Sequence, residues 1–196
     1  MRNAVIIHGR PDKDEYYSPN MPSLSNMHWL PWLQRQLQLK NIIAQTPEIP
    51  MSFRPDYKIW KKELERFDIT SETILVGHSC GGGFLVRWLT ENKDVKVGKV
   101  VLVAPWINPD DNPASETGDF FHFELDPTIA SRTKGLIIFL SDNDNQRGVK
   151  ETVHILKDKV DKIAIKNFQN YGHFLLEDMG TEKFPELLEE CLAENL

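Results

Sequence analysis

Short apolar segments alternate with helical patterns along the whole chain. Runs rich in valine, isoleucine and leucine predict buried strands, because β-branched and apolar residues in runs of this length are typical of strands. Strands are expected at Ala4–His8, Ile42–Gln45, Thr73–Val76, Val100–Val103, Leu136–Leu140 and Ile163–Ile165. Between them apolar residues recur every three or four positions, the spacing along one face of a helix. Helices are expected at Trp29–Leu39, at Tyr57–Phe67, after residue 79 with the inward stripe Phe84, Leu85, Trp88 and Leu89, and at Val149–Leu156 and Phe184–Ala193.

Strands that are continuously apolar and separated by helices predict a parallel sheet covered by helices on both faces, which is the α/β class. In such a sheet ligands bind beyond the carboxyl ends of the strands, so functional residues are expected in the loops that follow strands. The chain has no internal repeat, no low-complexity segment and no linker, and its 196 residues are enough for one hydrophobic core. A single domain over residues 1–196 is therefore expected.

The composition, 40% apolar and 27% charged, is that of an ordinary globular protein. The formal charge of −6 argues against nucleic acid or an anionic membrane as the main partner. No segment is long enough to span a membrane, and the N-terminus lacks a signal-peptide core. The two cysteines, Cys80 and Cys191, indicate a reducing compartment, so a cytoplasmic location is expected. The histidines and acids match no zinc spacing, and neither a metal nor another cofactor is expected.

The segment Ile74–Gly83 combines an apolar strand, a serine and a helix that opens with glycines. Its centre, Gly77-His78-Ser79-Cys80-Gly81, has the Gly-x-Ser-x-Gly pattern of a nucleophile elbow, a strained strand-to-helix turn that points a serine hydroxyl towards substrate. Glycines on both sides of the serine let strand and helix approach closely. Ser79 is therefore the expected nucleophile.

Two later loops hold the partners that such a serine needs. A serine hydroxyl is a weak nucleophile until a histidine takes its proton and a carboxylate orients that histidine. The loop after the penultimate strand, Ser141–Asn145, contains Asp142 and Asp144, and both are candidates for the acid. The loop after the last strand, Asn170–Phe174, contains His173, the expected base.

The first strand ends in His8-Gly9-Arg10, and the nucleophile is followed by Cys80. The backbone N–H groups of Cys80 and of Arg10 (or Gly9) are expected to form the oxyanion hole. His8 and His78 stand in turns beside glycines and are expected to be structural hydrogen-bonding groups that hold the elbow and the oxyanion loop.

The substrate pocket is expected near two aromatic residues. Trp106 directly follows the fourth strand, and it either lines the pocket or belongs to the core, as tryptophans in such chains mostly do. Residues 108–126 form the least regular segment of the chain and are expected to be a short cap. The hypothesis is that its phenylalanines, Phe121 in particular, form one wall of a shallow, open acyl pocket, and the alternative is that they only pack under a surface loop.

With these motifs the chain resembles the small serine hydrolases of the retinoblastoma-binding-protein-nine and YdeN type, a minimal branch of the α/β-hydrolases. The resemblance implies about six mostly parallel strands in the order 2-1-3-4-5-6 with helices on both faces. It implies Ser79 as nucleophile, His173 as base and, through Phe139-x-Ser141-x-x-Asp144, Asp144 as acid. The chain departs from the family in the loop at residues 10–15, which is not glycine-rich, and at residue 145, where asparagine replaces the usual proline. The retinoblastoma-binding motif Leu-x-Cys-x-Glu is absent, so that partner is not expected.

These observations predict a serine hydrolase that cleaves a carboxylic ester, thioester or amide of a small-molecule acyl substrate. Two alternatives stay open. Folds of this class also host binding proteins with a vestigial triad, and an acyltransferase would use the same triad. The sequence does not indicate the oligomeric state.

Overall fold

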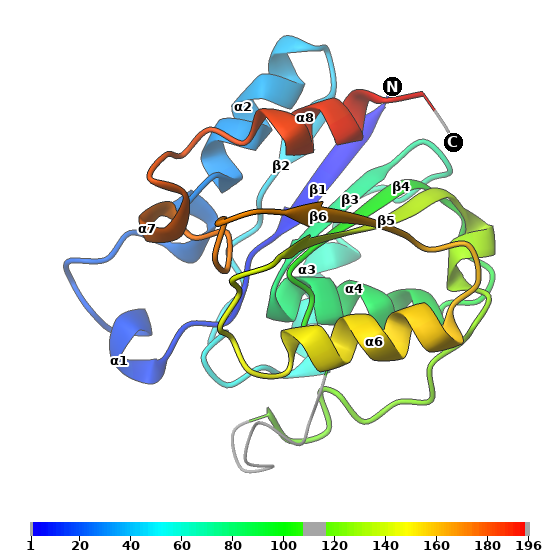
Figure 1. The fold of residues 1–196 in the computed structure, drawn as a ribbon, viewed down its shortest axis with the longest axis horizontal. Coiled ribbons are helices and arrows are strands. Elements are labelled where there is room, and N and C mark those ends of the chain that lie inside the picture. Colours follow the sequence, from blue (N-terminus) through cyan, green and yellow to red (C-terminus); the bar gives the residue numbers. More distant parts are fainter. Residues whose placement is uncertain (1, 108–116, 195–196) are drawn as a thin grey trace.

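The computed structural model describes residues 2–107 and 117–194. Six parallel strands form one sheet in the order β2-β1-β3-β4-β5-β6 (Figure 1), which confirms the predicted order. The strands are β1 (Asn3–Ile7), β2 (Ile43–Gln45), β3 (Ile74–His78), β4 (Val97–Val103), β5 (Thr133–Ser141) and β6 (Ala164–Phe168). The chain runs outward from β1 to β2 and then returns to place β3 on the other side of β1. This reversal leaves the carboxyl ends of β1 and β3 side by side, which is where open α/β sheets bind ligands.

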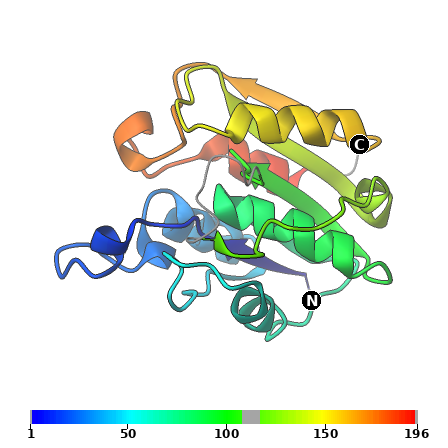
Figure 2. The same ribbon diagram turned by 90° about the horizontal axis from the view of Figure 1, so that it is seen from below.

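Helices cover both faces of the sheet (Figures 1 and 2). The helices are α2 (Leu30–Leu39), α3 (Tyr57–Leu64), α4 (Cys80–Glu91), α6 (Val149–Lys159) and α8 (Pro185–Leu192), with the shorter α1 (Lys13–Tyr16) and α7 (Leu176–Met179) and 3₁₀ turns at Leu24–Asn26 and Ile129–Arg132. Alternate strand residues point to opposite faces, so Ala4 and Ile6 pack with α2 and α8, while Val5 and Ile7 pack with α3, α4 and α6. Both short helices lie at the carboxyl end of the sheet (Figure 1). None of the helices in the described ranges has the length and apolar character needed to cross a membrane.

Helix α4, which follows Ser79, is buried on nearly every side, whereas the sequence predicted an inward stripe. All residues from Cys80 to Thr90 are buried, because α4 lies between α3 and α6 (Figure 2). The buried positive charge of Arg87 is compensated by two partners. Its guanidinium donates to the Glu91 carboxylate at 2.8 Å and lies 3.8 Å from the centre of the Tyr57 ring. The helix that begins at the elbow is therefore held firmly against the sheet.

The last strand ends later than its apolar pattern predicts. That pattern ends at Ile165, yet β6 pairs with β5 as far as Phe168 opposite Ser141. Lys166 and Asn167 are accommodated because β6 is an edge strand and both residues are exposed. The longer strand delivers the chain to the 170–173 loop at the carboxyl edge, beside the loop that follows β5.

Candidate active site

Ser79 stands at the turn between β3 and α4 in a strained backbone conformation, with φ 51° and ψ −119°. Non-glycine residues rarely adopt a positive φ, and such strain persists only where the surroundings impose it. Here the Ser79 N–H donates to the carbonyl of Val103 (2.9 Å), and the Ser79 carbonyl accepts from the N–H of Trp106 (3.1 Å). The end of β4 therefore holds the elbow on both sides, and the conformation expected at its apex is observed.

Close packing at the elbow requires glycine at two positions. A β-carbon at Gly77 would lie 2.7 Å from the backbone of Gly81 and Gly82, at the start of α4. A β-carbon at Gly81 would lie 2.6 Å from the carbonyl oxygen of Ile7 in β1. Both distances are too short for any side chain, so the Gly-x-Ser-x-Gly spacing reflects the meeting of β1, β3 and α4 in this fold.

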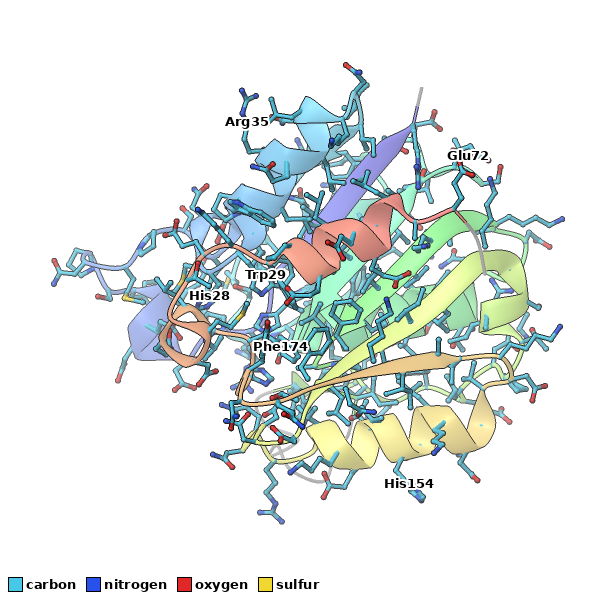
Figure 3. All side chains as sticks on the ribbon, turned by 45° about the horizontal axis from the view of Figure 1, so that its top comes forward. His28, Trp29, Arg35, Glu72, His154 and Phe174 are labelled. Carbon is cyan, nitrogen blue, oxygen red and sulfur yellow. The ribbon has the colours of Figure 1, made fainter. Side chains whose placement is uncertain are left out.

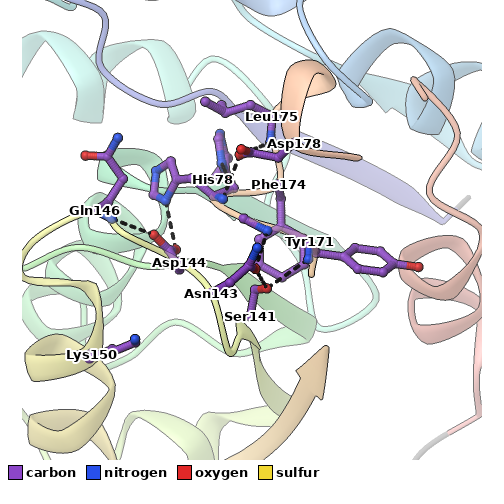
Figure 4. Close-up of polar contacts among 12 residues, drawn as sticks. His78, Ser141, Asn143, Asp144, Gln146, Lys150, Tyr171, Phe174, Leu175 and Asp178 are labelled. Carbon is purple, nitrogen blue, oxygen red and sulfur yellow. Dashed lines mark hydrogen bonds and ion pairs between the residues drawn. The ribbon is translucent and has the colours of Figure 1, made fainter. Parts of the chain in front are cut away.

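The loops after β5 and β6 are joined by a row of side-chain contacts (Figure 4). Four consecutive residues, 141–144, accept hydrogen bonds from four consecutive residues, 170–173. Figure 4 shows the contacts of Ser141, Asn143 and Asp144. The contacts are Asp142 Oδ1 with the Asn170 N–H (2.9 Å), Ser141 Oγ with the Tyr171 N–H (3.0 Å), Asn143 Oδ1 with the Gly172 N–H (2.8 Å) and Asp144 Oδ2 with His173 Nδ1 (2.9 Å). Ser141 Oγ also donates to Asn143 Oδ1 at 2.8 Å. These contacts set the position of the histidine loop relative to the acid loop.

The structure separates the two acid candidates. Asp144 contacts the imidazole of His173, and its side chain is fully buried while that of His173 is 10% exposed. Its other oxygen, Oδ1, accepts from the N–H of Gln146 at 2.8 Å. Asp142 is exposed and uses its carboxylate for a backbone N–H in the row described above. Asp144, not Asp142, is therefore the carboxylate that orients this imidazole.

The backbone of His173 is held by two further side chains. Asp178 Oδ2 accepts from the N–H of His173 (2.7 Å) and from that of Leu175 (3.3 Å). A β-carbon at Gly172 would overlap the Asp178 carboxylate, so this glycine makes room for it. On the other side, His78 Nε2–H donates to the His173 carbonyl at 2.8 Å. Asp178 was not expected from the sequence, because nothing local connects it to the histidine loop except Gly172.

His78 was expected to hold the elbow, but in the structure it supports the histidine loop. Burial lowers the pKa of His78 well below its ordinary value, and the neighbouring His173 and His28 lower it further. The ring is therefore neutral at pH 7, which suits a group that donates one hydrogen bond to a carbonyl.

His8 supports the expected oxyanion loop. Its Nε2 accepts from the N–H of Ile49 (3.0 Å), so its Nδ1 carries the proton and donates to the Gly9 carbonyl (2.7 Å). Burial lowers the pKa of His8, which keeps the ring in this neutral form. Because a trans peptide places C=O and N–H on opposite sides, the bond to the Gly9 carbonyl also orients the Arg10 N–H. A β-carbon at Gly9 would lie 3.3 Å from the Ser79 β-carbon, so this loop lies directly beside the serine.

A cavity of about 450 Å³ opens over Ser79 and contains most of the predicted site residues. The predicted residues that line it are Ser79, Cys80, Gly9, Arg10, His173 and Trp106, and further lining residues are His28, Gln146, Arg147 and Glu177.

Cys80 is the first residue of α4, so its N–H belongs to the first turn, where no intrahelical acceptor exists. Burial raises the pKa of its thiol to about 12, which makes the thiol unreactive. A second, larger cavity of about 750 Å³ lies along strand β2, and none of the described residues that line it is a serine, histidine or cysteine.

The structure corrects one of the expected substrate contacts. Phe121 is 5% exposed, and its ring packs edge-on against Trp106 with the ring centres 4.8 Å apart, so it lies behind Trp106 and does not line the cavity. The reason is that Phe121 belongs to the apolar core above α4, where Phe120 and Trp60 also pack. The first half of the expected cap, residues 108–116, lies outside the described residues. The lining that is described is largely polar, in contrast to the phenylalanine wall predicted from the sequence.

Ser79 Oγ has no hydrogen-bond partner within residues 2–107 and 117–194, although Ser79 and His173 share the cavity. In unliganded enzymes the bond between nucleophile and base is often long and tightens when substrate binds. Within the same ranges, no three or more His, Cys, Asp or Glu residues are grouped so that they could hold a metal ion. The arrangement suits proton transfer by a carboxylate-oriented imidazole that shares a cavity with a half-buried serine.

Replacing Asn143 by alanine should displace His173, and any reaction that depends on this imidazole should slow by about 10- to 100-fold, because small displacements of a reacting group are that costly. The alanine removes the acceptor shared by the Gly172 N–H and the Ser141 hydroxyl. Asn143→Asp keeps an oxygen at the same place and serves as the matched control. Steady-state kinetics with a p-nitrophenyl ester measure the effect, and an alanine variant as fast as the aspartate variant would show that the row of contacts does not position His173.

Comparison with known proteins gives one family and several structural neighbours. The model of the family described as Serine hydrolase matches residues 20–192. None of the curated proteins matches the sequence.

Among solved structures, the ydeN gene product from B. subtilis has a TM-score of 0.75 and 23% identity, covering 96% of both chains. A structure titled "LipS and LipT, two metagenome-derived lipolytic enzymes" has a TM-score of 0.65 and 14% identity, covering 97% of this chain and 91% of the other. Carboxylesterase CesB (YbfK) from Bacillus subtilis has a TM-score of 0.56 and 10% identity, covering 97% and 84%. At these identities the likeness establishes the fold, and the predicted α/β-hydrolase fold of the YdeN type is confirmed.

Proposed function

Because this chain belongs to the serine hydrolase family, we propose that it cleaves a carboxylic ester, thioester or amide through an acyl-enzyme on Ser79. One observation carries the proposal: the buried pair of Asp144 and His173, 2.9 Å apart, faces the same cavity as a serine in the strained conformation of an elbow. A serine hydroxyl becomes a useful nucleophile only with such a base nearby.

In the proposed reaction Ser79 Oγ attacks the carbonyl carbon of the substrate while His173 Nε2 takes the hydroxyl proton. The carbonyl oxygen becomes an oxyanion, which the N–H groups of Cys80 and Arg10 stabilise, each such donor being worth about 10²–10³ in rate. His173 then gives its proton to the leaving group as the bond to that group breaks. Water repeats the sequence on the acyl-enzyme, with His173 as base, and releases the acid and free Ser79.

The surroundings of His173 favour the charged intermediate of this cycle. Asp144 holds the ring in the tautomer with a proton on Nδ1, which leaves Nε2 free to accept the serine proton. The two histidines nearest to it, His78 and His28, both have pKa values lowered chiefly by burial and are neutral at pH 7. The imidazolium therefore forms in contact with the Asp144 carboxylate, and neither of these two rings competes with it as a cation.

The lining of the cavity supports a polar small-molecule acyl substrate over a long aliphatic one. Gln146, Glu177 and His28 line the same cavity as Ser79, and such polar side chains lose hydration without compensation when they contact only hydrocarbon. A cytoplasmic location belongs to the same proposal, since both cysteines are free and buried, as is usual where disulfides do not form.

A fluorophosphonate probe tests the proposed function directly. Ser79 Oγ should bond to the phosphorus of the probe as fluoride leaves, and digestion followed by mass spectrometry should find the adduct on the peptide that contains Ser79. Heat-denatured protein and the Ser79→Ala variant provide the controls, and neither should be labelled. A folded protein that acquires no adduct, or acquires it on another residue, would contradict the proposal.

A further inference from the structure

His28 faces the cavity that contains Ser79 and His173 but takes no part in the steps above. It lies beside α7, next to Trp29 and near Phe174 (Figure 3). Its φ of 55° is unusual for a residue with a side chain, and conformations of this kind concentrate at functional sites. Its ring centre is 6.1 Å from that of His78, which in turn lies 5.1 Å from that of His173. Three imidazoles therefore stand in sequence at one side of the cavity.

The hydrogen bonding of His28 determines which ring nitrogen carries its proton. Nδ1 accepts from the N–H of Leu176 at 3.0 Å, so in the neutral ring the proton is on Nε2. Burial lowers the pKa of His28, with His173 acting in the same direction and Glu177 and Asp178 opposing it, so the ring is neutral at pH 7. His28 therefore presents an Nε2–H donor without a positive charge.

This donor is accessible from the cavity. Within residues 2–107 and 117–194, Nε2 has no hydrogen-bond partner, and this atom is not completely buried. A polar atom with neither a protein partner nor complete burial faces solvent, and the hollow that His28 lines is the cavity over Ser79. A bound molecule there can accept a hydrogen bond from it.

The position of His28 indicates which part of a substrate it meets. The leaving group receives its proton from His173 and must lie against that ring. Leu175 and Glu177 flank the same side of the cavity, and His28 is bonded to their segment through the N–H of Leu176. Gly9 and Arg10 line the cavity from a different segment, the one that follows β1. His28 is therefore placed beside the leaving group.

We propose that His28 is a specificity-determining residue whose Nε2–H donates a hydrogen bond to a neutral acceptor in the leaving group, such as an ether, hydroxyl or carbonyl oxygen near the scissile bond. The neighbouring carboxylate of Glu177 disfavours an anionic leaving group at this place. The inference rests on the proposed function and extends it, because it names the class of alcohol that the enzyme releases: one with an acceptor oxygen close to the ester.

Two acetate esters of equal size test the contact. In 2-methoxyethyl acetate an ether oxygen stands where n-butyl acetate has a methylene group, so the ratio of their kcat/KM values reports recognition of the acceptor. The ratio does not depend on the fraction of active enzyme. The two esters also differ in intrinsic reactivity, so the kcat/KM ratio is divided by the ratio of their alkaline hydrolysis rates. After this correction, kcat/KM of wild type for the methoxyethyl ester should exceed that for the butyl ester by about threefold to tenfold, the range for one neutral hydrogen bond.

Two variants separate substrate recognition from support of Leu176. In His28→Asn the amide oxygen takes the place of Nδ1 and keeps the bond to the Leu176 N–H, while the donor at the Nε2 position is lost; asparagine also tolerates the positive φ. In His28→Gln the amide nitrogen takes the place of Nε2, and the acceptor for Leu176 is lost. The asparagine variant should lose the preference and the glutamine variant should keep it.

The opposite pattern, in which the asparagine variant keeps the preference and the glutamine variant loses it, would show that His28 acts only by holding Leu176 and would overturn the inference. Equal ratios in wild type and both variants would also overturn it, while leaving the proposed hydrolase intact. A folded wild type that takes no fluorophosphonate label and hydrolyses neither ester would overturn both the proposed function and the role of His28.

Discussion

Replacing Asp144 by asparagine should lower kcat by about 10⁴-fold while the protein remains folded. The amide of asparagine can occupy the same space, but it cannot stabilise the imidazolium, and it can donate to Nδ1 and so favour the wrong tautomer of His173. Asp144 makes the contact with Nδ1 from a fully buried side chain, so neither solvent nor another carboxylate replaces it. Steady-state kinetics with a p-nitrophenyl ester would measure the loss.

The matched control is the same substitution two residues earlier. Asp142→Asn keeps an oxygen that can accept from the Asn170 N–H and changes an exposed side chain, so kcat should stay within about threefold of wild type. A large loss in the Asp142 variant and a small loss in the Asp144 variant would mean that the acid loop rearranges when substrate binds. Thermal denaturation of both variants separates a catalytic effect from unfolding.

Replacing Lys99 by methionine should lower the free energy of unfolding by about 3–5 kcal/mol, because removing one partner of a buried ion pair leaves the other uncompensated. Lys99 and Glu190 are each 4% exposed. The ammonium of Lys99, on β4, donates to the Glu190 carboxylate (2.9 Å), to the Glu190 carbonyl (2.8 Å) and to the Ala193 carbonyl (3.0 Å). It therefore ties the end of α8 to the middle of the sheet.

Denaturant titration would measure the loss, and the double variant Lys99→Met/Glu190→Leu is its control. An apolar pair of similar volume removes the unpaired charge, so the double variant should recover most of the stability lost in the single variant. A single variant as stable as wild type would show that Lys166, which also contacts Glu190 at 2.5 Å, neutralises the carboxylate by itself.

The same ion pair predicts how stability depends on acid pH. Burial alone would raise the pKa of Glu190, but the ammonium groups of Lys166 and Lys99 outweigh it and hold the pKa below its ordinary value of 4.5. A carboxyl whose pKa is lower in the folded state stabilises the fold fully above its unfolded pKa, and this stabilisation is lost as the pH falls through the folded pKa. Wild type should therefore lose stability below about pH 4.5 more steeply than Glu190→Gln, in denaturant titrations at several pH values.

Much of the fold follows from the sequence alone. The lengths and apolar character of the strands, and the helical spacing between them, predict an α/β sheet with both faces covered, because backbone geometry imposes these periods wherever an element is buried. The elbow is equally local: a five-residue pattern contains the serine and the glycines that the meeting of strand and helix requires. Ser79 and His173 could be named because each lies in a turn or loop that follows a strand, and such loops gather at one edge of a parallel sheet.

The tertiary structure decided matters that depend on the direction of a side chain. Asp142 and Asp144 lie two residues apart in one loop, and only the path of that loop shows that the first meets a backbone N–H and the second meets the imidazole. Asp178 follows His173 by five residues, yet its role depends on the turn that brings its carboxylate back to the His173 N–H. Phe121 was misplaced for the same reason, since an aromatic residue in a loop can turn towards the core or the cavity.

The chain by itself thus determined which residue types meet at the carboxyl edge of the sheet, since periodicity and strand order are properties of the backbone. Which of those residues touch each other was decided by the turns after β5 and β6, because the path of each turn sets the direction of its side chains. His28 is the clearest case. It lies in a segment without strand or helix, 148 residues from its partner Leu176, and only the folded chain brings it to the cavity that contains Ser79.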